Sequence, residues 1–290
     1  MHFRKELRQV ADLRKRPVTI GSRTMCKRTS PNLDRTLRPA DGRFLCRFPF
    51  PPTQQTHESK SDFRARIRAQ FADIHYAFTN DVEVIWTLYL DGFERYEMGG
   101  QKDLDNYLKP LIDAIKGPDA LLVDDALIQT LTVTWIDTTA DPHFTLEITS
   151  LDPLAFLPKP IELWEMPDGL YYPFSAMNRT VKGLVPFTME QRKLLARGMF
   201  GTTSVKAAFR SALRNKGTDP RATYYETMPF HPIGRGYPIA FAKRSELSMV
   251  SMVEWRQLYT TDELDEMDSH AAALRHDFER ITSPANGADS

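Results

Sequence analysis

The acidic residues best suited to chemistry lie in two short segments of the sequence. Asp103 and Asp105 stand two residues apart, and Lys109 follows one helical turn after Asp105. The second segment is the acidic pair Asp124-Asp125. Carboxylate oxygens are hard ligands that suit Mg²⁺ or Mn²⁺ better than zinc, and a lysine beside them can stabilise charge on a phosphate. Together these residues are the parts of a site for metal-assisted phosphodiester hydrolysis.

These carboxylates can meet only if the backbone around them has a particular form. On one helix, Asp103 and Asp105 would point about 200° apart, so we expect Asp103 to be extended and the helix to begin at Leu104. Asp125 is in phase with the apolar residues of the strand that follows it, so it is expected to face the packed helices, with Asp124 pointing the other way. The sequence therefore predicts a metal site formed by Asp103, Asp105 and Asp125.

The same residues also fit an ordinary structural role. Asp105, Lys109 and Asp113 follow one another at four-residue steps, which is the spacing of a salt-bridge ladder on a helix. Asp103 fits an N-cap, and residues 123–125 fit a turn. Spacing alone leaves both interpretations open.

The elements that must position these residues are predicted in the order β-α-β-α-β-β. Alternation of apolar and polar residues predicts strands, and apolar residues at steps of three and four predict helices. The last two strands are separated by a short polar segment and are expected to form a hairpin. In chain order, the predicted elements are a strand at Arg43–Phe50, a helix at Ser61–Phe78, a strand at Val82–Leu90, a helix at Leu104–Ile115, and strands at Leu127–Trp135 and His143–Thr149.

Several spaced motifs occur in a fixed order within this region. They are Phe48–Gln54, a strand that runs into two prolines, then Asp103-Leu104-Asp105-Asn106 with Lys109, then Asp113-Ala114-Ile115, and finally Asp124-Asp125. Over about residues 43–150, this set resembles the signature of the RusA family of Holliday-junction resolvases. The resemblance implies a small α/β fold with a mixed sheet and a homodimer that cuts four-way DNA junctions. It also implies that Asp103, Asp105 and Asp125 bind the metal and that Lys109 is needed for cleavage.

Charge is segregated along the chain, although the net charge is zero. Residues 1–47 carry thirteen Lys and Arg against four acidic residues, residues 190–246 carry eleven against four, and residues 260–290 carry two against eight. Basic segments are typical of contact with a nucleic-acid backbone, although a flexible arm or a solvated helix face gives the same counts. Unlike RusA proteins, this chain has few basic residues just before the D-x-D motif, so its DNA contacts are expected elsewhere.

A proline-containing stretch at residues 152–160 predicts a linker between two domains. The expected organisation is a basic extension at residues 1–42, a RusA-like nuclease domain at 43–152, a mostly α or α+β domain at 153–259 and an acidic tail at 260–290. The second domain is expected to recruit the DNA substrate, with docking of a protein partner as the alternative. The acidic tail could screen the basic surfaces.

Two features of residues 153–259 could bind nucleic acid. Helices at Thr188–Arg197 and Thr203–Asn215 fit a helix-turn-helix, although a basic stripe is more often a solvated helix face. Its DNA-contacting residues would be Lys206, Arg210 and Arg214. Aromatic residues interleaved with basic ones fit a platform that stacks on single-stranded bases, or simply a core; they are Tyr224, Tyr225, Phe230, Tyr237 and Phe241.

Composition places the chain among globular proteins, with 41% hydrophobic and 26% charged residues. It has no apolar run of about 18 residues that could cross a membrane, and its two cysteines form no zinc motif, so a cytoplasmic protein is expected. The sequence predicts a Mg²⁺- or Mn²⁺-dependent endonuclease that selects branched DNA such as Holliday junctions. The alternative is a non-catalytic DNA-binding or assembly protein that retains the fold.

Overall fold

The computed structural model of the protein describes residues 35–38, 42–52, 60–97, 103–152, 156–181, 183–228 and 235–282. These residues belong to one compact unit, Asp34–Ser290, of mixed α and β structure. The basic extension predicted at residues 1–42 lies almost entirely outside the described residues. Its described part is strand β1 (Arg35–Arg38), which pairs with β2 (Arg43–Phe48), so the sheet begins within the segment predicted to be an extension.

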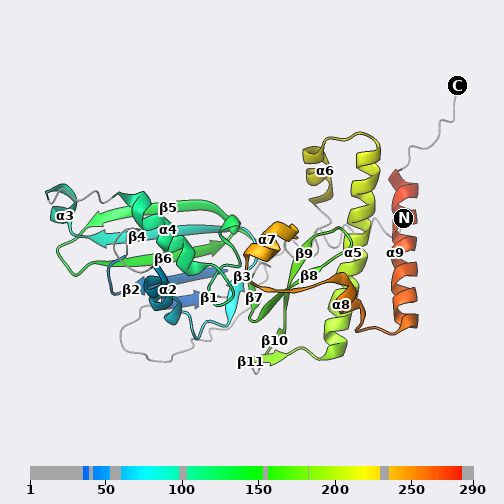
Figure 1. Ribbon diagram of the computed structural model, residues 1–290, viewed down its shortest axis with the longest axis horizontal. Coiled ribbons are helices and arrows are strands. Elements are labelled where there is room, and N and C mark those ends of the chain that lie inside the picture. Colours follow the sequence, from blue (N-terminus) through cyan, green and yellow to red (C-terminus); the bar gives the residue numbers. More distant parts are fainter. Residues whose placement is uncertain are drawn as a thin grey trace. The chain divides into compact units, whose positions relative to one another are not determined.

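The central element is a mixed sheet with the strand order β1-β2-β6-β4-β5 (Figure 1). Its other strands are β4 (Val82–Leu90), β5 (Ile128–Asp137) and β6 (His143–Ser150). Strands β4 and β5 are parallel, whereas β6 is antiparallel to both β2 and β4. The predicted bounds of β4 are confirmed, and its residues alternate between buried and half-buried as the sequence indicates. A mixed sheet is therefore confirmed.

The predicted hairpin between the last two strands is wrong. Strands β5 and β6 lie on opposite sides of β4 and do not pair with each other. The five residues between Asp137 and His143 can span up to about 17 Å, and crossing one intervening strand needs only about 10 Å. A short connection therefore does not require the two strands to be neighbours.

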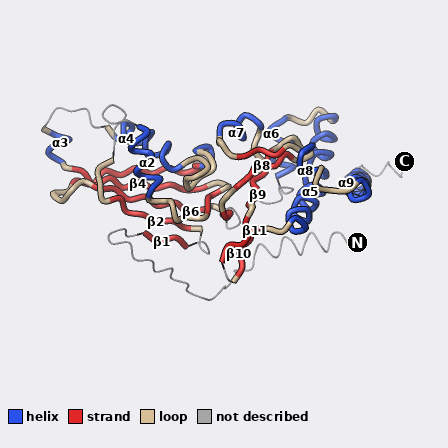
Figure 2. The backbone as a smooth tube through the Cα atoms, turned by 60° about the horizontal axis from the view of Figure 1, so that its bottom comes forward, coloured by secondary structure: helices blue, strands red, loops and turns tan. Residues whose placement is uncertain are grey.

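Helices α2 (Lys60–Ala69) and α4 (Leu104–Ile115) lie on the same face of this sheet (Figure 2). Helix α2 inserts Phe63 and Ile67 into the core, where Phe48 stacks on Phe144 at a ring distance of 4.5 Å. The bounds of α4 agree with the prediction. The much shorter helix α3 (Gly92–Tyr96) follows β4.

Helix α2 ends at Ala69, earlier than the predicted end at Phe78. Residues 76–78 instead form β3 (Tyr76–Phe78), which pairs with β7 (Phe156–Pro158). Phe71 and Ile74 are buried, but they reach the core from the segment between α2 and β3. Apolar spacing therefore identified buried residues correctly while overstating the length of the helix.

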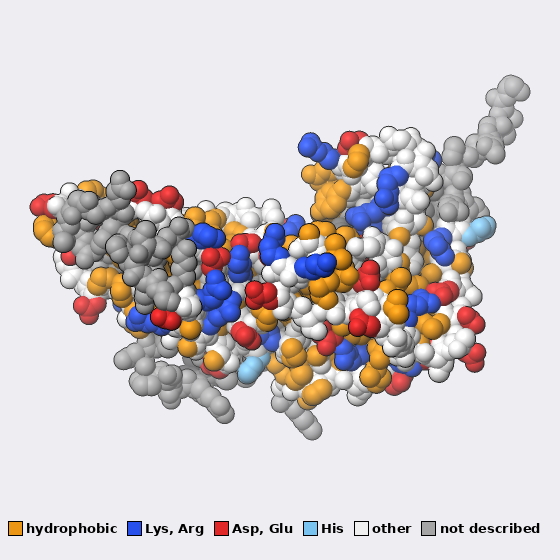
Figure 3. Space-filling view, in the orientation of Figure 1, with side chains coloured by type: hydrophobic (Ala, Val, Ile, Leu, Met, Phe, Trp, Pro, Cys, Tyr) orange, Lys and Arg blue, Asp and Glu red, His pale blue; other side chains and the backbone are white. Residues whose placement is uncertain are grey.

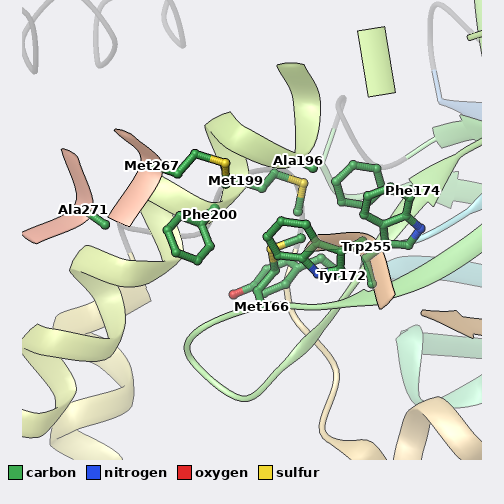
Figure 4. Close-up of a cluster of buried hydrophobic side chains, with 10 residues drawn as sticks. Met166, Tyr172, Phe174, Ala196, Met199, Phe200, Trp255, Met267 and Ala271 are labelled. Atoms are coloured by element: carbon green, nitrogen blue, oxygen red, sulfur yellow. The ribbon is translucent and has the colours of Figure 1, made fainter. Parts of the chain in front are cut away.

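The carboxy-terminal part of the chain combines a small sheet with helices. The sheet has the order β12-β8-β9, and a separate pair of strands, β10 and β11, precedes the long helix α5. A cluster of buried side chains joins the sheet to α5, α8 and α9 (Figure 4). The bounds are β8 Ile161–Glu165, β9 Tyr171–Ser175, β10 Met177–Thr180, β11 Gly183–Pro186, α5 Met189–Asn215, α6 Pro220–Thr227, α7 Ile239–Arg244, β12 Ser248–Val250, α8 Met252–Arg256 and α9 Thr261–Thr282.

The predicted helix-turn-helix is also wrong. Residues 189–215 form one continuous helix, α5, which starts with a capping box between Thr188 and Gln191. Gly198 and Gly201 lie inside it rather than in a turn, and a Cβ at Gly201 would be 3.8 Å from Leu274 of α9. A glycine costs a helix only about 1 kcal/mol relative to alanine. Burial of one side of α5 can exceed that cost.

The acidic residues after position 260 form helix α9, which packs against α5. Glu263 of α9 pairs with Lys193 at 2.9 Å, and Glu266 pairs with Arg197. The acidic segment thus compensates part of the positive charge that residues 190–246 carry in the sequence.

Candidate active site

The start of α4 has the form that the spacing of its two aspartates required. Asp103 is the N-cap residue with an extended backbone (φ −93°, ψ 147°), and its side chain makes no capping hydrogen bond. The helix begins at Leu104, and Asp105 in its first turn accepts a hydrogen bond of 3.0 Å from the backbone amide of Asn106. Asp103 and Asp105 are both exposed. The two carboxylates are therefore open to solvent at one end of α4.

Lys109 lies one turn further along α4 and is also exposed, with 61% of its side chain accessible. Its ammonium group is 3.4 Å from the carboxylate of Asp113. One step of the salt-bridge ladder is therefore present. An ion pair whose lysine is this exposed contributes little to stability, typically less than about 1 kcal/mol, so Lys109 can turn to another anion at small cost.

The Asp124-Asp125 pair differs from the prediction. Asp125 begins a short 3-10 helix, η2 (Asp125–Leu127), and β5 starts only at Ile128. The alternation of β5 therefore cannot be extended back to Asp125. Asp124, expected to point away from the core, is the buried residue at 2% exposure, and its carboxylate accepts a hydrogen bond of 2.8 Å from the amide of Ala126.

Asp125 is bound by Lys116, the residue that follows α4. The Lys116 ammonium group is 2.6 Å from Asp125 and 3.3 Å from Asp113. Burial opposes the charged form of Lys116, but the hydrogen bonds to Asp125 and Asp113 outweigh it and raise the pKa of Lys116 above its usual value. The carboxylate of Asp125 is thus held at the last turn of α4.

Asp124 is bound by Arg244 of α7, 120 residues later in the chain. Two nitrogens of the Arg244 guanidinium group contact the two carboxylate oxygens of Asp124 at 2.9 and 3.0 Å, a bidentate ion pair. Burial alone would raise the pKa of Asp124, but the hydrogen bonds from Arg244 and Ala126 lower it overall. Arg235 adds a hydrogen bond of 3.1 Å to the carbonyl oxygen of Ala126. The turn is therefore fixed from the carboxy-terminal part of the chain.

The expected meeting of Asp103, Asp105 and Asp125 does not occur in this arrangement. Asp113, which shares Lys116 with Asp125, lies eight residues after Asp105, or about 12 Å further along the helix axis. Within the described part of the chain, no three His, Cys, Asp or Glu side chains are grouped so that they could hold a metal ion. Asp103 and Asp105 thus stand at one end of α4, and Asp125 stands at the other.

The three basic residues predicted to contact DNA from α5 have different environments. Lys206 is fully buried and pairs with the equally buried Asp168 at 2.8 Å, so it is not part of an exposed stripe. Arg210 donates a hydrogen bond of 3.0 Å to the hydroxyl of Thr227. Arg214 is exposed and donates to the carbonyl oxygen of Arg210. Only part of the predicted stripe therefore reaches the surface.

The aromatic residues of the predicted stacking platform also differ in exposure. Tyr237 and Phe241 are buried and stack on each other, as the core interpretation expected. Tyr224 and Tyr225 of α6 are exposed by 41% and 69%. Phe230 lies outside the described residues. The four described aromatic residues therefore form no continuous row of exposed rings.

Comparison of the chain with protein-family models and with curated proteins gives no match. Among the helices in the described ranges, none is long and apolar enough to pass through a membrane.

The bonds that Lys116, Arg235 and Arg244 make at this turn were not predicted from the sequence, which placed Arg235 and Arg244 only among the basic residues of the stacking platform. Lys116 had a local signal, since it follows Asp113 by three residues at the end of a helix that Gly117-Pro118 terminates. No local pattern could link Arg244 to Asp124, because the bond between them depends on how the two parts of the chain pack.

Proposed function

We propose that the protein is a metal-dependent, structure-selective endonuclease that hydrolyses phosphodiester bonds in branched DNA such as Holliday junctions. One observation carries the proposal. The D-x-D-N motif that resembles the RusA family lies where α4 begins, with Asp103 extended, Asp105 in the first turn and both side chains exposed. Asp103 is an N-cap residue that makes no capping bond, which leaves its carboxylate available to a cation.

Asp103 and Asp105 are the residues that would hold Mg²⁺ or Mn²⁺. Mg²⁺ is often bound by only one or two carboxylates, with water and substrate phosphate oxygens as the other ligands, so the two exposed acids fit such an ion. When bound, the ion would polarise the phosphate and activate water for hydrolysis.

Lys109 and Asp125 have separate parts in the proposal. The exposed ammonium group of Lys109, one turn from Asp105, would stabilise the negative charge that develops on the phosphate. Asp125 enters through the resemblance alone, because Lys116 holds it beside the last turn of α4.

The proposal is tested by incubating the purified protein with labelled four-way junctions, flaps, forks, linear duplexes and single strands, with and without Mg²⁺. We expect Mg²⁺-dependent cleavage of a branched DNA in preference to linear DNA. If no DNA in this set is cut in Mg²⁺ or Mn²⁺, the proposal is wrong.

We further propose that the protein acts as a cytoplasmic homodimer in DNA recombination or repair. Paired cuts in a two-fold symmetric junction require two active sites related by a two-fold axis. Light scattering at micromolar concentration, with and without junction DNA, measures this directly. A monomeric mass under both conditions would contradict resolvase action.

A non-catalytic role in DNA binding or assembly is the second candidate, and a specific observation favours it. The acids lie at both ends of α4, and Asp125 is occupied by an ion pair of 2.6 Å with Lys116. A protein that only binds DNA would keep such acids for structural reasons. It would bind branched DNA in the assay above and leave it intact.

A further inference from the structure

We propose that Arg64, Arg68 and Lys159 form a binding site for a phosphate of the DNA backbone, next to the turn that follows α4. The choice of DNA as the ligand rests on the proposed function, whereas the affinity for phosphate rests on the three side chains themselves. This site would supply the backbone contacts for which the sequence offers few basic residues near the D-x-D motif.

Two of these cations reach the same turn, residues 116–119, from different elements. Arg68 of α2 donates a hydrogen bond of 2.6 Å to the carbonyl oxygen of Lys116. Lys159, which follows β7, donates one of 3.3 Å to the carbonyl oxygen of Asp119. Gly117 lies between them with φ +111°, and a Cβ there would be only 3.1 Å from the Arg68 guanidinium group. The turn is thus shaped to admit a cationic side chain close to its backbone.

The positive charge of this group is poorly compensated. Arg64 and Arg68 are four residues apart on α2, a spacing at which like charges repel. The Nε atoms of both are buried and have no hydrogen-bond partner among the described residues. Within the same part of the chain, no carboxylate lies within 4 Å of the charged nitrogens of Arg64, Arg68 or Lys159.

The pKa values of Arg68 and Lys159 reflect the closeness of the positive charges at this site. Burial and the nearby charge of Arg64 lower the pKa of Arg68, although Asp119 and Glu246 act in the opposite direction. Burial and the charge of Arg68 lower the pKa of Lys159 to about 8, with Asp119 again opposing. A bound anion would relieve both the repulsion and the lost solvation.

Other basic residues are less suited to this role. Lys193, Arg197 and Lys206 have carboxylate partners within the protein. Figure 3 shows Lys and Arg side chains on the surface between α2 and α7, interspersed with Asp and Glu.

Phosphate is the anion that best fits these groups. A guanidinium group binds two phosphate oxygens through parallel hydrogen bonds, and an ammonium group adds a compact charge. The site also adjoins Asp125 at the last turn of α4, since Lys116 accepts the bond from Arg68 through its carbonyl oxygen and binds Asp125 through its ammonium group. A strand held here would run past the last turn of α4.

The test compares DNA binding by R68Q, K159Q and the control R179Q in the full-length protein. Arg179 of β10 is exposed and is not among the residues predicted to contact DNA, so its substitution removes one surface charge and no element of the site. Affinity for a labelled junction and a labelled duplex is measured by fluorescence anisotropy over a range of salt. We expect R68Q and K159Q to weaken binding to both DNAs and to reduce the salt slope by about 0.9 for each phosphate that the variant no longer neutralises. We expect R179Q to have a much smaller effect.

A second arm uses pyrophosphate and does not depend on DNA. The ammonium group of Lys159 is titrated by NMR with and without pyrophosphate, in the unmodified protein and in R68Q, whose fold is checked by its thermal midpoint. We expect pyrophosphate to raise the pKa of Lys159 in the unmodified protein and to raise it less in R68Q.

The outcomes separate this site from the proposed function. If the unmodified protein binds DNA and both variants bind like R179Q, the site is overturned. If the unmodified protein binds no DNA but pyrophosphate raises the pKa of Lys159, the proposed function fails and the phosphate site stands. If pyrophosphate has no effect on Lys159 and DNA does not bind, both are wrong.

Discussion

The two ends of α4 present the same kind of residue in opposite circumstances. At the first turn, Asp103 and Asp105 are exposed, and Asp103 makes no capping bond. Beside the last turn, Asp124 is buried in a bidentate pair with Arg244, and Asp125 is bound by Lys116. The partners of a carboxylate, rather than its spacing in the sequence, therefore determine whether it can accept a ligand.

Asp125 is the residue for which a catalytic role and a structural role give the most different predictions. The family resemblance predicts that D125N abolishes cleavage, lowering the rate by at least about 1,000-fold. The ion pair between Asp125 and Lys116, by contrast, predicts only a small decrease in the stability of D125N. Cleavage rate and thermal midpoint are measured together. D113N is the matched control, because it removes the other carboxylate bound to Lys116, and we expect it to keep its cleavage activity. A normal rate for D125N would make Asp125 a structural partner of Lys116 only.

Asp124 should show the largest effect on folding. D124N removes one partner of a buried ion pair, and we expect it to lower the free energy of unfolding by about 3 kcal/mol, at the low end of the range for such pairs because Arg244 is half exposed. Because the folded-state pKa of Asp124 is lowered, this stability is present at neutral pH and is lost as the pH falls through that pKa. Urea unfolding at neutral and acid pH measures both effects. Unchanged stability at neutral pH would show that the turn does not depend on Arg244.

Lys109 is expected to act on rate and not on stability. K109A should lower the cleavage rate at saturating DNA by about 100-fold, because its charge is used mainly in the transition state. The Lys109 side chain is exposed and 3.4 Å from Asp113, so the thermal midpoint should stay within error. A large fall in the midpoint with little change in rate would support the salt-bridge ladder instead.

The smallest expected effect concerns pH. Because the pKa of Lys159 is lowered to about 8, DNA affinity should fall several-fold between about pH 7 and pH 9 as this lysine loses its proton. K159R keeps the charge over this range and should remove most of the dependence. If the unmodified protein and K159R show the same pH profile, Lys159 does not contact the phosphate.

The sequence was informative where local patterns are decisive. The bounds of β4 and α4 could be predicted because alternation and helical spacing are uninterrupted there and Gly117-Pro118 ends α4. Predictions failed where packing overrides local signals, as in the continuous helix α5 and the separated strands β5 and β6.

The candidate site, like the fold, could be predicted only in part. The extended Asp103 and the helix start at Leu104 were expected from the spacing of two aspartates. The orientation of Asp124 and Asp125 was not, because η2 interrupts the alternation that the prediction assumed. The ion pair between Arg244 and Asp124 joins residues 120 positions apart, which no local rule can anticipate.

The most direct test of the proposed endonuclease function is the rate at which D105N cleaves the preferred branched DNA in Mg²⁺, measured beside the unmodified protein. We expect cleavage to be abolished, while the thermal midpoint is unchanged and DNA affinity is equal or higher, because an exposed negative charge near phosphate has been removed. Cleavage by D105N at close to the unmodified rate would contradict it, because the exposed acids at the start of α4 would then have no part in the reaction.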